Sequence, residues 1–470
     1  MENKKHKILT AGIGYIIGGL LIKGIAFITT PLFTRLVTQE EFGMINRYLS
    51  IEAFIVMLVG FQINTSYKSA KIKYQNDKFD IDNYHSLASV IVVFHTIICL
   101  IVANVFHDIV SSIVGIKSVL LLNLLVLNAF GAVMINLYNS YVALDYSYKK
   151  YVVIALLNAI TNVVLSVILI LTVCTEHRAE GRIYGYAIPY ILIGCLILYL
   201  ALKNHKLQIK NSKEKIKFVY TYDAPLVVNG VAETVLGQYG KLSIDKYIGL
   251  SEMGIYSLSY NIYSIIGVIS VALDYVVGPF YFEKRKLGDI EGIKSITNTY
   301  FKILGIISIL IMFLAPEITL ILGGKEYQTA MYSAIPLVVA SYIVFCCYTV
   351  NQEILFNQKT KLITIISLSV MITNIVGNSI LVRKFGIMGA SYTTLLSYLL
   401  QFYLYYLLIR KVLKQDVFDW KRLFKYVLTV LLISFIALFV CKYMWIRIVL
   451  ISITFCILVI EGIKFLKKSF

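Results

Sequence analysis

Ionisable and strongly polar residues stand inside long apolar runs of this sequence, where a charge is costly to bury. Lys23 and Glu52 lie in the first two runs, and Asp274 and Glu353 lie towards the ends of two later ones. Another run carries a stripe of residues spaced by four, namely Asn229, Glu233, Gly237 and Lys241. Residues spaced by four share one face of a helix, so the stripe predicts a polar face. Either a binding role or a buried ion pair with a purely structural role would explain these residues, and the sequence leaves both open.

The composition is that of a protein that crosses a membrane many times. Hydrophobic residues make up 59% of the 470 residues and charged residues 15%, against about 45–50% and 25% in soluble domains. A spanning helix needs about 20 mostly apolar residues. The sequence therefore predicts an all-α polytopic membrane protein with about fourteen transmembrane helices and no soluble domain between them. The predicted spans are 9–33, 44–66, 86–107, 118–140, 151–173, 183–202, 221–244, 254–281, 298–321, 328–356, 361–382, 386–409, 424–443 and 446–465.

The net charge of +18 is explained by the turns between these spans. A basic protein could bind nucleic acid, but the Lys and Arg residues form no continuous patch, so no nucleic-acid partner is expected. When the N-terminus is placed inside, most of the 44 Lys and Arg residues fall in cytoplasmic turns. This bias predicts a multi-pass protein of the cytoplasmic (inner) membrane with both termini in the cytoplasm.

The seven cysteines indicate neither disulfides nor a zinc site. Most of them lie in apolar runs, with no CxxC motif and no regular spacing. Small apolar packing residues are the better explanation. We predict no metal, no cofactor and no catalytic residue.

The sequence also contains an internal repeat. RLVTQEEFGMIN at 35–46 is echoed by KYIGLSEMGIYS at 246–257, and ITNVV at 160–164 is echoed by ITNIV at 372–376 at nearly the same offset. Two copies of a six-helix unit would be parallel to each other, as in transporters that rock around a central cavity. We expect two parallel six-helix bundles around such a cavity, plus two appended helices. The expected parts are an N-terminal bundle 1–202, a basic cytoplasmic linker 203–220, a C-terminal bundle 221–412 and an appended helix pair 413–470.

The repeated stretches each contain a glycine, Gly43 in the first and Gly254 in the second. A glycine at this place would let two neighbouring spans pack closely, or it would simply mark a turn. The sequence does not decide between these two roles.

Two motifs resemble those of a known family. PLFTRLVTQEEFG after the first span, DKYIGLSEMGIYSLSYN after the seventh, and fourteen spans in two halves resemble bacterial polysaccharide-unit flippases for O-antigen or capsule. These flippases belong to the multidrug/oligosaccharidyl-lipid/polysaccharide exporter superfamily. Asp245-Lys246 stands where many members have Asp-Arg. The resemblance implies transfer of an undecaprenyl-pyrophosphate-linked oligosaccharide from the inner to the outer leaflet of the lipid bilayer, with a polysaccharide polymerase as a candidate partner.

An anionic pyrophosphate headgroup implied by the resemblance would need cations in place of its water shell. The cations best placed on the first helices of each half are Lys23, Arg35, Arg47, Lys241 and Lys246. Lys23 and Glu233 stand at similar depth before their repeated motifs, so we expect them to pair across the central cavity in one conformation.

Tyr256, Tyr260 and Tyr263 fall on one face of the eighth span. They could stack on sugar rings while their hydroxyl groups bond sugar hydroxyls. Helix packing and interfacial belts explain many tyrosines in membrane proteins, so this alternative stays open.

Three other functions remain as alternatives. A cation-coupled multidrug exporter of the same superfamily would need a compact acidic site, for which Glu52, Asp274 and Glu353 are the coupling candidates. A membrane polysaccharide polymerase would favour acidic catalytic groups in a large outer loop, but the outer loops are short. A flippase for a lipid-linked peptidoglycan precursor is the third.

Overall fold

The computed structural model describes residues 14, 18–19, 21, 24–25, 27–73, 78–145, 147–204 and 212–469. Within these residues the regular structure is helical and no strand occurs. The helices are α2 (Gln39–Gly60), α3 (Ile63–Lys73), α4 (Lys78–Val105), α5 (His107–Val114), α6 (Val119–Ala143), α7 (Tyr148–Thr172), α8 (Arg178–Asn204), α9 (Ser212–Tyr247), α10 (Leu250–Lys286), α11 (Ile290–Gly323), η2 (Lys325–Tyr327), α12 (Ala330–Phe356), α13 (Thr360–Leu407), η3 (Leu408–Val412), α14 (Trp420–Val440) and α15 (Met444–Ser469).

The all-α polytopic fold predicted from the sequence is confirmed. Ten helices in the described part of the chain are long and apolar enough to cross a membrane. Every predicted span after the first is helical for most of its length, although 44–66 is divided between α2 and α3 by a turn at Phe61 and Gln62. Most of the first span, 9–33, lies outside the described residues. Predicted spans seven and eight lie in α9 and α10, which are longer than a bilayer requires and are not among those ten.

The long helix α13 holds two of the predicted spans. Its backbone is not helical at Gly386, where φ is 60° and ψ is −138°. A positive φ of this kind is readily adopted only by glycine. Gly386 therefore divides α13 into the predicted spans 361–382 and 386–409.

The chain forms two compact units. Unit 1 comprises Met1–Thr29 and Met44–Thr234, and unit 2 comprises Thr30–Gly43 and Val235–Phe470. The boundaries fall inside helices, since α9 begins in unit 1 and ends in unit 2. The sequence repeat predicted a different division of the chain, and that division stays a prediction. Its parts are 1–202, 203–220, 221–412 and 413–470.

Unit 1 is built around the packing of α2, α3, α4, α6 and α8. Its buried core is made of aliphatic residues and of aromatic residues such as Tyr67 and Tyr84, whose rings meet edge to face. Large apolar side chains such as Phe94 and Val153 are more than half exposed. Such outward-facing apolar surface is typical of helices that contact lipid.

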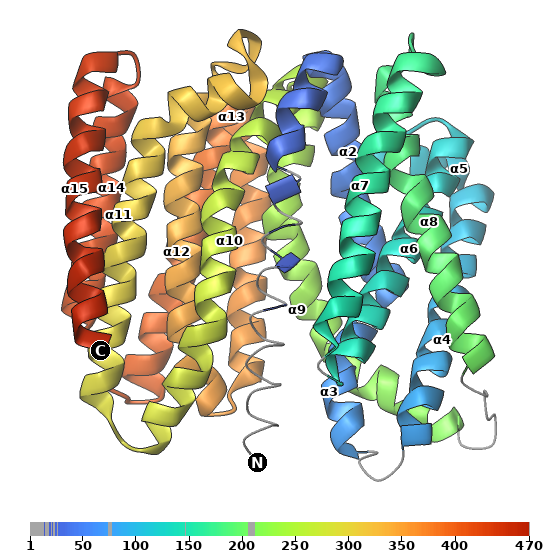
Figure 1. Cartoon of the computed structure of the whole chain (residues 1–470), viewed down its shortest axis with the longest axis horizontal. Helices are drawn as coiled ribbons and strands as arrows, with labels where there is room; N and C mark the ends of the chain where they lie inside the picture. Colours follow the sequence, from blue (N-terminus) through green and yellow to red (C-terminus); the bar gives the residue numbers. More distant parts are fainter. Residues whose placement is uncertain are drawn as a thin grey trace. The chain divides into compact units, whose positions relative to one another are not determined.

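Unit 2 has α12 as its most enclosed helix, with 89% of its spanning segment buried. Helices α10, α11 and α13 pack around it. The appended helices α14 and α15 lie side by side against α11, where Figure 1 draws them in red. Only 11% of the spanning segment of α15 is buried, so this helix forms the outer edge of unit 2.

The two repeated glycines meet in unit 2. A methyl group on Gly43 would collide with the backbone carbonyl of Leu250, and one on Gly254 would collide with that of Gln39. Ser251 Oγ donates a hydrogen bond of 3.0 Å to Gln39 Oε1 beside this contact. Neither glycine has a positive φ. The structure therefore favours close helix approach over turn geometry as the reason for these glycines.

Candidate functional site

The end of α9 and the start of α10 bring together a lysine and tyrosines that the sequence predicted as binding residues. Lys241 Nζ lies 4.5 Å from the centroid of the Tyr260 ring. The rings of Tyr260 and Tyr263 are 4.5 Å apart between centroids and inclined by 32°. Gly237 lies beside these rings, and a methyl group there would make an ordinary contact of 3.6 Å with the Tyr260 hydroxyl oxygen. We call Lys241, Tyr260 and Tyr263 the cation–tyrosine cluster.

Tyr256 packs between the cation–tyrosine cluster and a core of unit 2. Its side chain is 1% exposed and packs with Ile244, Met253 and Leu337 in a core of unit 2. Its ring centroid lies 6.3 Å from that of Tyr260. Tyr256 therefore fixes the position of Tyr260, while Tyr260 and Tyr263 are only partly buried and present ring surface.

The chemistry of the cation–tyrosine cluster suits an anion attached to a sugar. Lys241 rests on an aromatic face, and no carboxylate of the described residues forms an ion pair with it. A cation held only by a ring quadrupole keeps its ammonium donors for a ligand. The tyrosine rings offer stacking surface next to this charge.

The other predicted cations lie apart from one another in the two units. In unit 2, Arg35 is exposed and its guanidinium lies 3.4 Å from the carbonyl oxygens of Pro31 and Ile321. Lys246 is also exposed, with Nζ 5.7 Å from the centroid of Tyr247. Their use as substrate ligands stays a prediction.

The remaining predicted cations are Arg47 and Lys23. In unit 1, Arg47 donates a 2.8 Å hydrogen bond to the carbonyl of Gly115, which caps α5. This contact gives Arg47 a role in holding α5 to α2. Lys23 lies outside the described residues, so its pairing with Glu233 also stays a prediction.

The stripe on α9 is divided between the two units. In unit 1, Asn229 Nδ2 donates a 3.0 Å hydrogen bond to Glu233 Oε1. The amide oxygen of Asn229 is buried and has no hydrogen-bond partner among the described residues. Lys241 belongs to unit 2.

Glu52 is a buried carboxyl group in unit 1. It is 6% exposed and accepts a 3.1 Å hydrogen bond from the Tyr186 hydroxyl. Asn128 and Tyr48 are buried beside it. Neither amide atom of Asn128 nor the hydroxyl of Tyr48 makes a hydrogen bond within the described part of the chain. A buried carboxyl next to unpaired polar atoms has the composition of a proton or small-cation site.

Arg182 lies just before the predicted span 183–202, in the turn that precedes it, and the structure places it inside α8. Its Nη1 donates to Asn162 Oδ1 at 2.6 Å and to Ser166 Oγ at 2.7 Å, both on α7. Its guanidinium carbon lies 5.7 Å from the Tyr186 ring centroid. Asn162 was noticeable in the sequence as a polar residue in a span, but nothing there indicated Arg182 as its partner.

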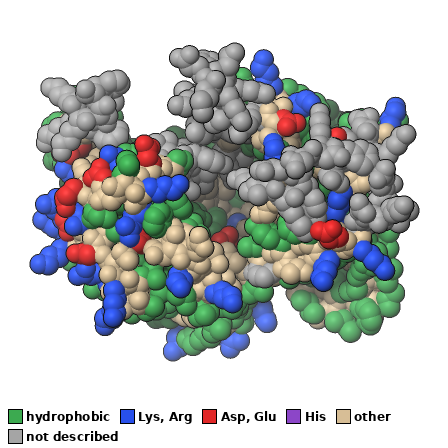
Figure 2. Space-filling model, turned by 90° about the horizontal axis from the view of Figure 1, so that it is seen from below, with side chains coloured by type: hydrophobic (Ala, Val, Ile, Leu, Met, Phe, Trp, Pro, Cys, Tyr) green, Lys and Arg blue, Asp and Glu red, His purple; other side chains and the backbone are tan. Residues whose placement is uncertain are grey.

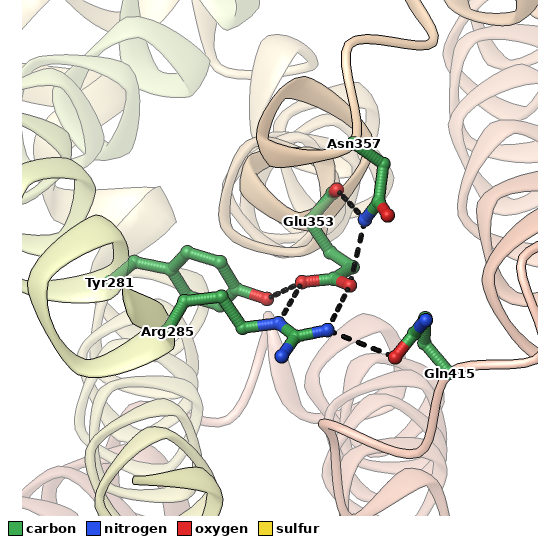
Figure 3. Close-up of polar contacts among 5 residues, drawn as sticks. All are labelled: Tyr281, Arg285, Glu353, Asn357 and Gln415. Carbon is green, nitrogen blue, oxygen red and sulfur yellow. Dashed lines mark hydrogen bonds and ion pairs between the residues drawn. The ribbon is translucent and has the colours of Figure 1, made fainter. Parts of the chain in front are cut away.

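Glu353 is fully buried on α12 and its carboxylate oxygens are all occupied (Figure 3). Arg285 binds it in a bidentate ion pair, with Nε 3.0 Å from Oε2 and Nη2 3.1 Å from Oε1. Tyr281 Oη donates to Oε2 and Asn357 Nδ2 donates to Oε1 at 2.8 Å. The same Arg285 reaches Gln415 Oε1 at 2.9 Å. We call these five residues the Glu353 network.

The Glu353 network joins α10, α12 and the segment before α14 at one end of unit 2. Hydrogen bonding to Glu353 is the main reason that the pKa of Arg285, which lies beyond the predicted span, is raised. Because both carboxylate oxygens of Glu353 are hydrogen-bonded, the arrangement is that of an ion pair with a structural role. A coupling role for Glu353 would require the ion pair with Arg285 to break. The side chain of Asp274, the third coupling candidate, lies outside the described residues.

No group of three or more His, Cys, Asp or Glu side chains in the described part of the chain is placed to hold a metal ion. The cation–tyrosine cluster, the Glu52 carboxyl with its polar neighbours, and the Glu353 network are the polar groups that bear on the predicted site residues.

The sequence matches a family described as polysaccharide biosynthesis protein over residues 9–282, which is more than half of the chain. The chain belongs to this family. The family resemblance stated from the sequence is thereby confirmed. No curated protein matches the chain in sequence.

The fold of this family member is similar to those of solved flippases and transporters. For the lipid II flippase MurJ in an inward closed conformation, the TM-score is 0.73 at 16% identity, covering 97% of this chain and 99% of that one. For an inward-facing multidrug resistance MATE family transporter of the MOP superfamily, it is 0.65 at 15% identity, covering 85% and 96%. For the Vibrio cholerae MATE transporter VcmN, it is 0.59 at 12% identity, covering 88% and 98%. Identities this low establish the fold alone.

Proposed function

We propose that this protein is a flippase that moves an undecaprenyl-pyrophosphate-linked oligosaccharide repeat unit from the inner to the outer leaflet. In this proposal it serves the synthesis of a surface polysaccharide such as O-antigen or capsule, lies in the cytoplasmic membrane with both termini in the cytoplasm, and catalyses no covalent step. Membership of the polysaccharide biosynthesis protein family and the fold shared with a lipid II flippase support this proposal.

The observation that carries the proposal is the cation–tyrosine cluster. A charged, sugar-bearing headgroup cannot cross lipid without polar groups that replace its water shell. Lys241 supplies a positive charge that no described carboxylate neutralises, and Tyr260 and Tyr263 supply ring surface beside it. A cation next to stacked rings fits a ligand that joins phosphate to sugar.

Transport can be measured with the purified protein in vesicles that contain a fluorescent lipid-linked oligosaccharide. A membrane-impermeant quencher reports how much of the lipid has crossed to the other leaflet. The proposal predicts that Lys241→Met lowers the rate at least about tenfold, because one charge-assisted contact to the headgroup is lost. The protein should stay folded, since a thioether is less costly than an unpaired ammonium at this partly buried place.

Lys384→Met is the matched control, because Lys384 is an exposed lysine of unit 2 outside the predicted binding residues. It should transport at the wild-type rate. If Lys241→Met also transports at that rate while remaining folded, the cation–tyrosine cluster does not bind the headgroup. If the wild-type protein does not move the lipid-linked oligosaccharide at all, the flippase assignment itself is refuted.

A cation-coupled multidrug exporter is the second candidate, and the Glu52 site is the observation that favours it. The buried Glu52 carboxylate could take up a proton, or bind a sodium ion together with the amide oxygen of Asn128 and the hydroxyl oxygen of Tyr48. Under this proposal, Glu52→Gln should abolish the dependence of transport on a proton or sodium gradient. Drug efflux without movement of the lipid-linked oligosaccharide would decide for the exporter, whereas movement of the lipid with no drug efflux would decide for the flippase.

A further inference from the structure

A polar cavity of about 540 Å³ lies at one end of unit 2, apart from the cation–tyrosine cluster. It is lined by residues near the starts of α11 and α14, by Arg410 of η3 and by the segment that joins η3 to α14. Figure 2 views the molecule from this end, where basic and acidic side chains are mixed at the left. The basic side chains that line the cavity are Lys294, Arg410, Lys421 and Arg422, and the acidic ones are Glu291, Asp416 and Asp419.

Two buried polar side chains in the cavity wall lack partners. Trp420 is 7% exposed, and its indole Nε1 makes no hydrogen bond to any described residue. Asn298 is 9% exposed, and its Oδ1 is likewise unpaired within the described part of the chain. An indole nitrogen can only donate, and an amide can present either its oxygen or its NH₂ group. Because buried polar atoms are nearly always paired, the indole Nε1 points to a ligand with an acceptor atom. The amide of Asn298 would accept from a donor of the same ligand or, when turned over, donate to it.

The cavity's basic side chains are only weakly engaged by protein acids. Arg410 Nη1 lies 2.5 Å from Asp416 Oδ1, but both side chains are largely exposed at 42% and 67%. Lys294 Nζ lies 3.5 Å from Glu291 Oε1, whose side chain is 88% exposed. Exposed pairs of this kind contribute little and leave donors free for a ligand.

Lys421 and Arg422 lie in the first turn of α14. Arg422 Nε lies 3.0 Å from Asp419 Oδ2, and Lys421 forms no ion pair with a described residue. The cavity therefore holds basic donors from three separate chain segments.

The cavity also lies at the amino ends of two helices. Helix α11 begins at Ile290 and α14 begins at Trp420, and residues near both starts line the cavity. The amino end of a helix carries a partial positive charge that favours anions. With four basic and three acidic side chains in the lining, the surplus is a single positive charge. This balance matches a ligand with one negative charge better than a pyrophosphate.

The apolar surface next to the cavity indicates which kind of molecule would carry such an anion. Apolar side chains more than half exposed run along one face of α14 from the same end, namely Leu428, Leu432, Phe435 and Phe439. A basic cavity at the end of spanning helices with an apolar stripe above it has the form of a lipid headgroup site. We propose that this cavity binds the phosphate of an anionic phospholipid with a single phosphodiester charge, whose acyl chains lie along α14.

The Glu353 network would hold this headgroup site in shape. Gln415 accepts a hydrogen bond from Arg285, which fixes the segment before α14 to α10 (Figure 3). Three residues further on, Phe418 stacks on Tyr281 with ring centroids 5.9 Å apart. Trp420, two residues later, meets Phe418 edge to face with ring centroids 5.4 Å apart. The bound lipid would therefore be linked mechanically to the buried ion pair of unit 2.

Native mass spectrometry of the full-length protein, extracted from vesicles of equal phosphatidylglycerol and phosphatidylcholine, tests the proposal. The wild-type protein should retain phosphatidylglycerol in preference to phosphatidylcholine. Trp420→Phe keeps the ring and removes only the unpaired donor, and should lower the retained phosphatidylglycerol about fivefold. The double variant Lys421→Gln with Arg422→Gln should lower it further. Lys359→Gln, a basic residue of the α12–α13 turn outside the cavity, should retain as much as the wild type.

Soluble glycerol phosphate distinguishes a lipid from a free phosphate compound. If it displaces phosphatidylglycerol from the wild type and not from Trp420→Phe, the cavity recognises the headgroup phosphate as proposed. If glycerol phosphate binds while phosphatidylglycerol shows no preference over phosphatidylcholine, the ligand is a soluble anion and the lipid proposal is wrong. Equal retention of both lipids without glycerol phosphate binding, or an unchanged Trp420→Phe variant, also overturns it. None of these results depends on transport, so the flippase proposal is tested separately.

Discussion

Breaking the ion pair of the Glu353 network should destabilise unit 2 strongly. Glu353 is 0% exposed and the Arg285 side chain is 17% exposed, so removal of the guanidinium leaves a buried carboxylate without its counter-charge. Loss of one partner of a buried pair costs about 3–5 kcal/mol. Tyr281 and Asn357 would still donate to the carboxylate, which places Arg285→Gln nearer the lower value. Arg285→Lys should cost less, about 1–3 kcal/mol, because it keeps the charge and loses the fork geometry and the bond to Gln415.

Thermal unfolding of the purified protein in detergent measures this effect. At about 2–4 °C per kcal/mol for a unit of 250 residues, Arg285→Gln should lower the unfolding temperature by roughly 10 °C. The combined variant Arg285→Gln with Glu353→Gln should lose less stability than the two single variants lose together, because neither charge is left buried without its partner.

Lys284→Gln is the matched control, since the neighbouring Lys284 makes a 2.7 Å pair with Asp289 at the surface. Its unfolding temperature should stay close to that of the wild type. If Arg285→Gln unfolds at the same temperature as Lys284→Gln, the pair does not hold unit 2 together and the argument from burial is refuted.

Three further predictions follow from the fold and the cation–tyrosine cluster. Gly254→Ala should destabilise the protein by about 1–3 kcal/mol because a methyl group meets the backbone of Gln39, whereas Gly267→Ala, which has open space, should be neutral; equal unfolding temperatures would contradict this. Tyr260→Ala should slow vesicle transport about tenfold and Tyr260→Phe less than about threefold, because phenylalanine keeps the ring under Lys241. A reporter fused in segment 203–217 should read as cytoplasmic and one near Glu180 as external, and the opposite pattern would reverse the predicted orientation.

The membrane-spanning helices could be predicted because apolarity is a local property of sequence. Runs of about 20 apolar residues are visible without knowledge of any partner. The ends of the helices were harder to predict. Helix α10 continues to Lys286, past the predicted end at 281, and α8 begins at Arg178, before the predicted start at 183. Charged residues such as Arg182 and Arg285 continue these helices beyond their apolar parts and bond to neighbouring helices.

The ion pair and hydrogen bonds between helices could not be predicted, because they join faces of different helices. Periodicity shows that residues share a face, but it does not show which faces of two helices meet. Arg285 and Glu353 are 68 positions apart, and Arg285 and Gln415 are 130 apart. Arg182 was assigned to a turn for the same reason, because its partners Asn162 and Ser166 are on another helix. The repeated glycines were visible in the sequence, but only the structure shows that Gly254 packs against the backbone of Gln39.

Arg285 and Lys241 of unit 2 lie in opposite kinds of surroundings, and this difference separates a structural charge from a binding charge. Arg285 gives its guanidinium to a buried carboxylate, so its charge is neutralised within the protein and nothing is left for a ligand. Lys241 lies on the Tyr260 ring with no carboxylate of the described residues paired to it, so part of the cost of placing this ammonium away from water remains. An anionic headgroup that reached Lys241 would recover that cost, and binding would be strongest in whichever conformation exposes the ammonium. A ligand that prefers one conformation shifts the equilibrium towards it, which is the step that alternating access requires.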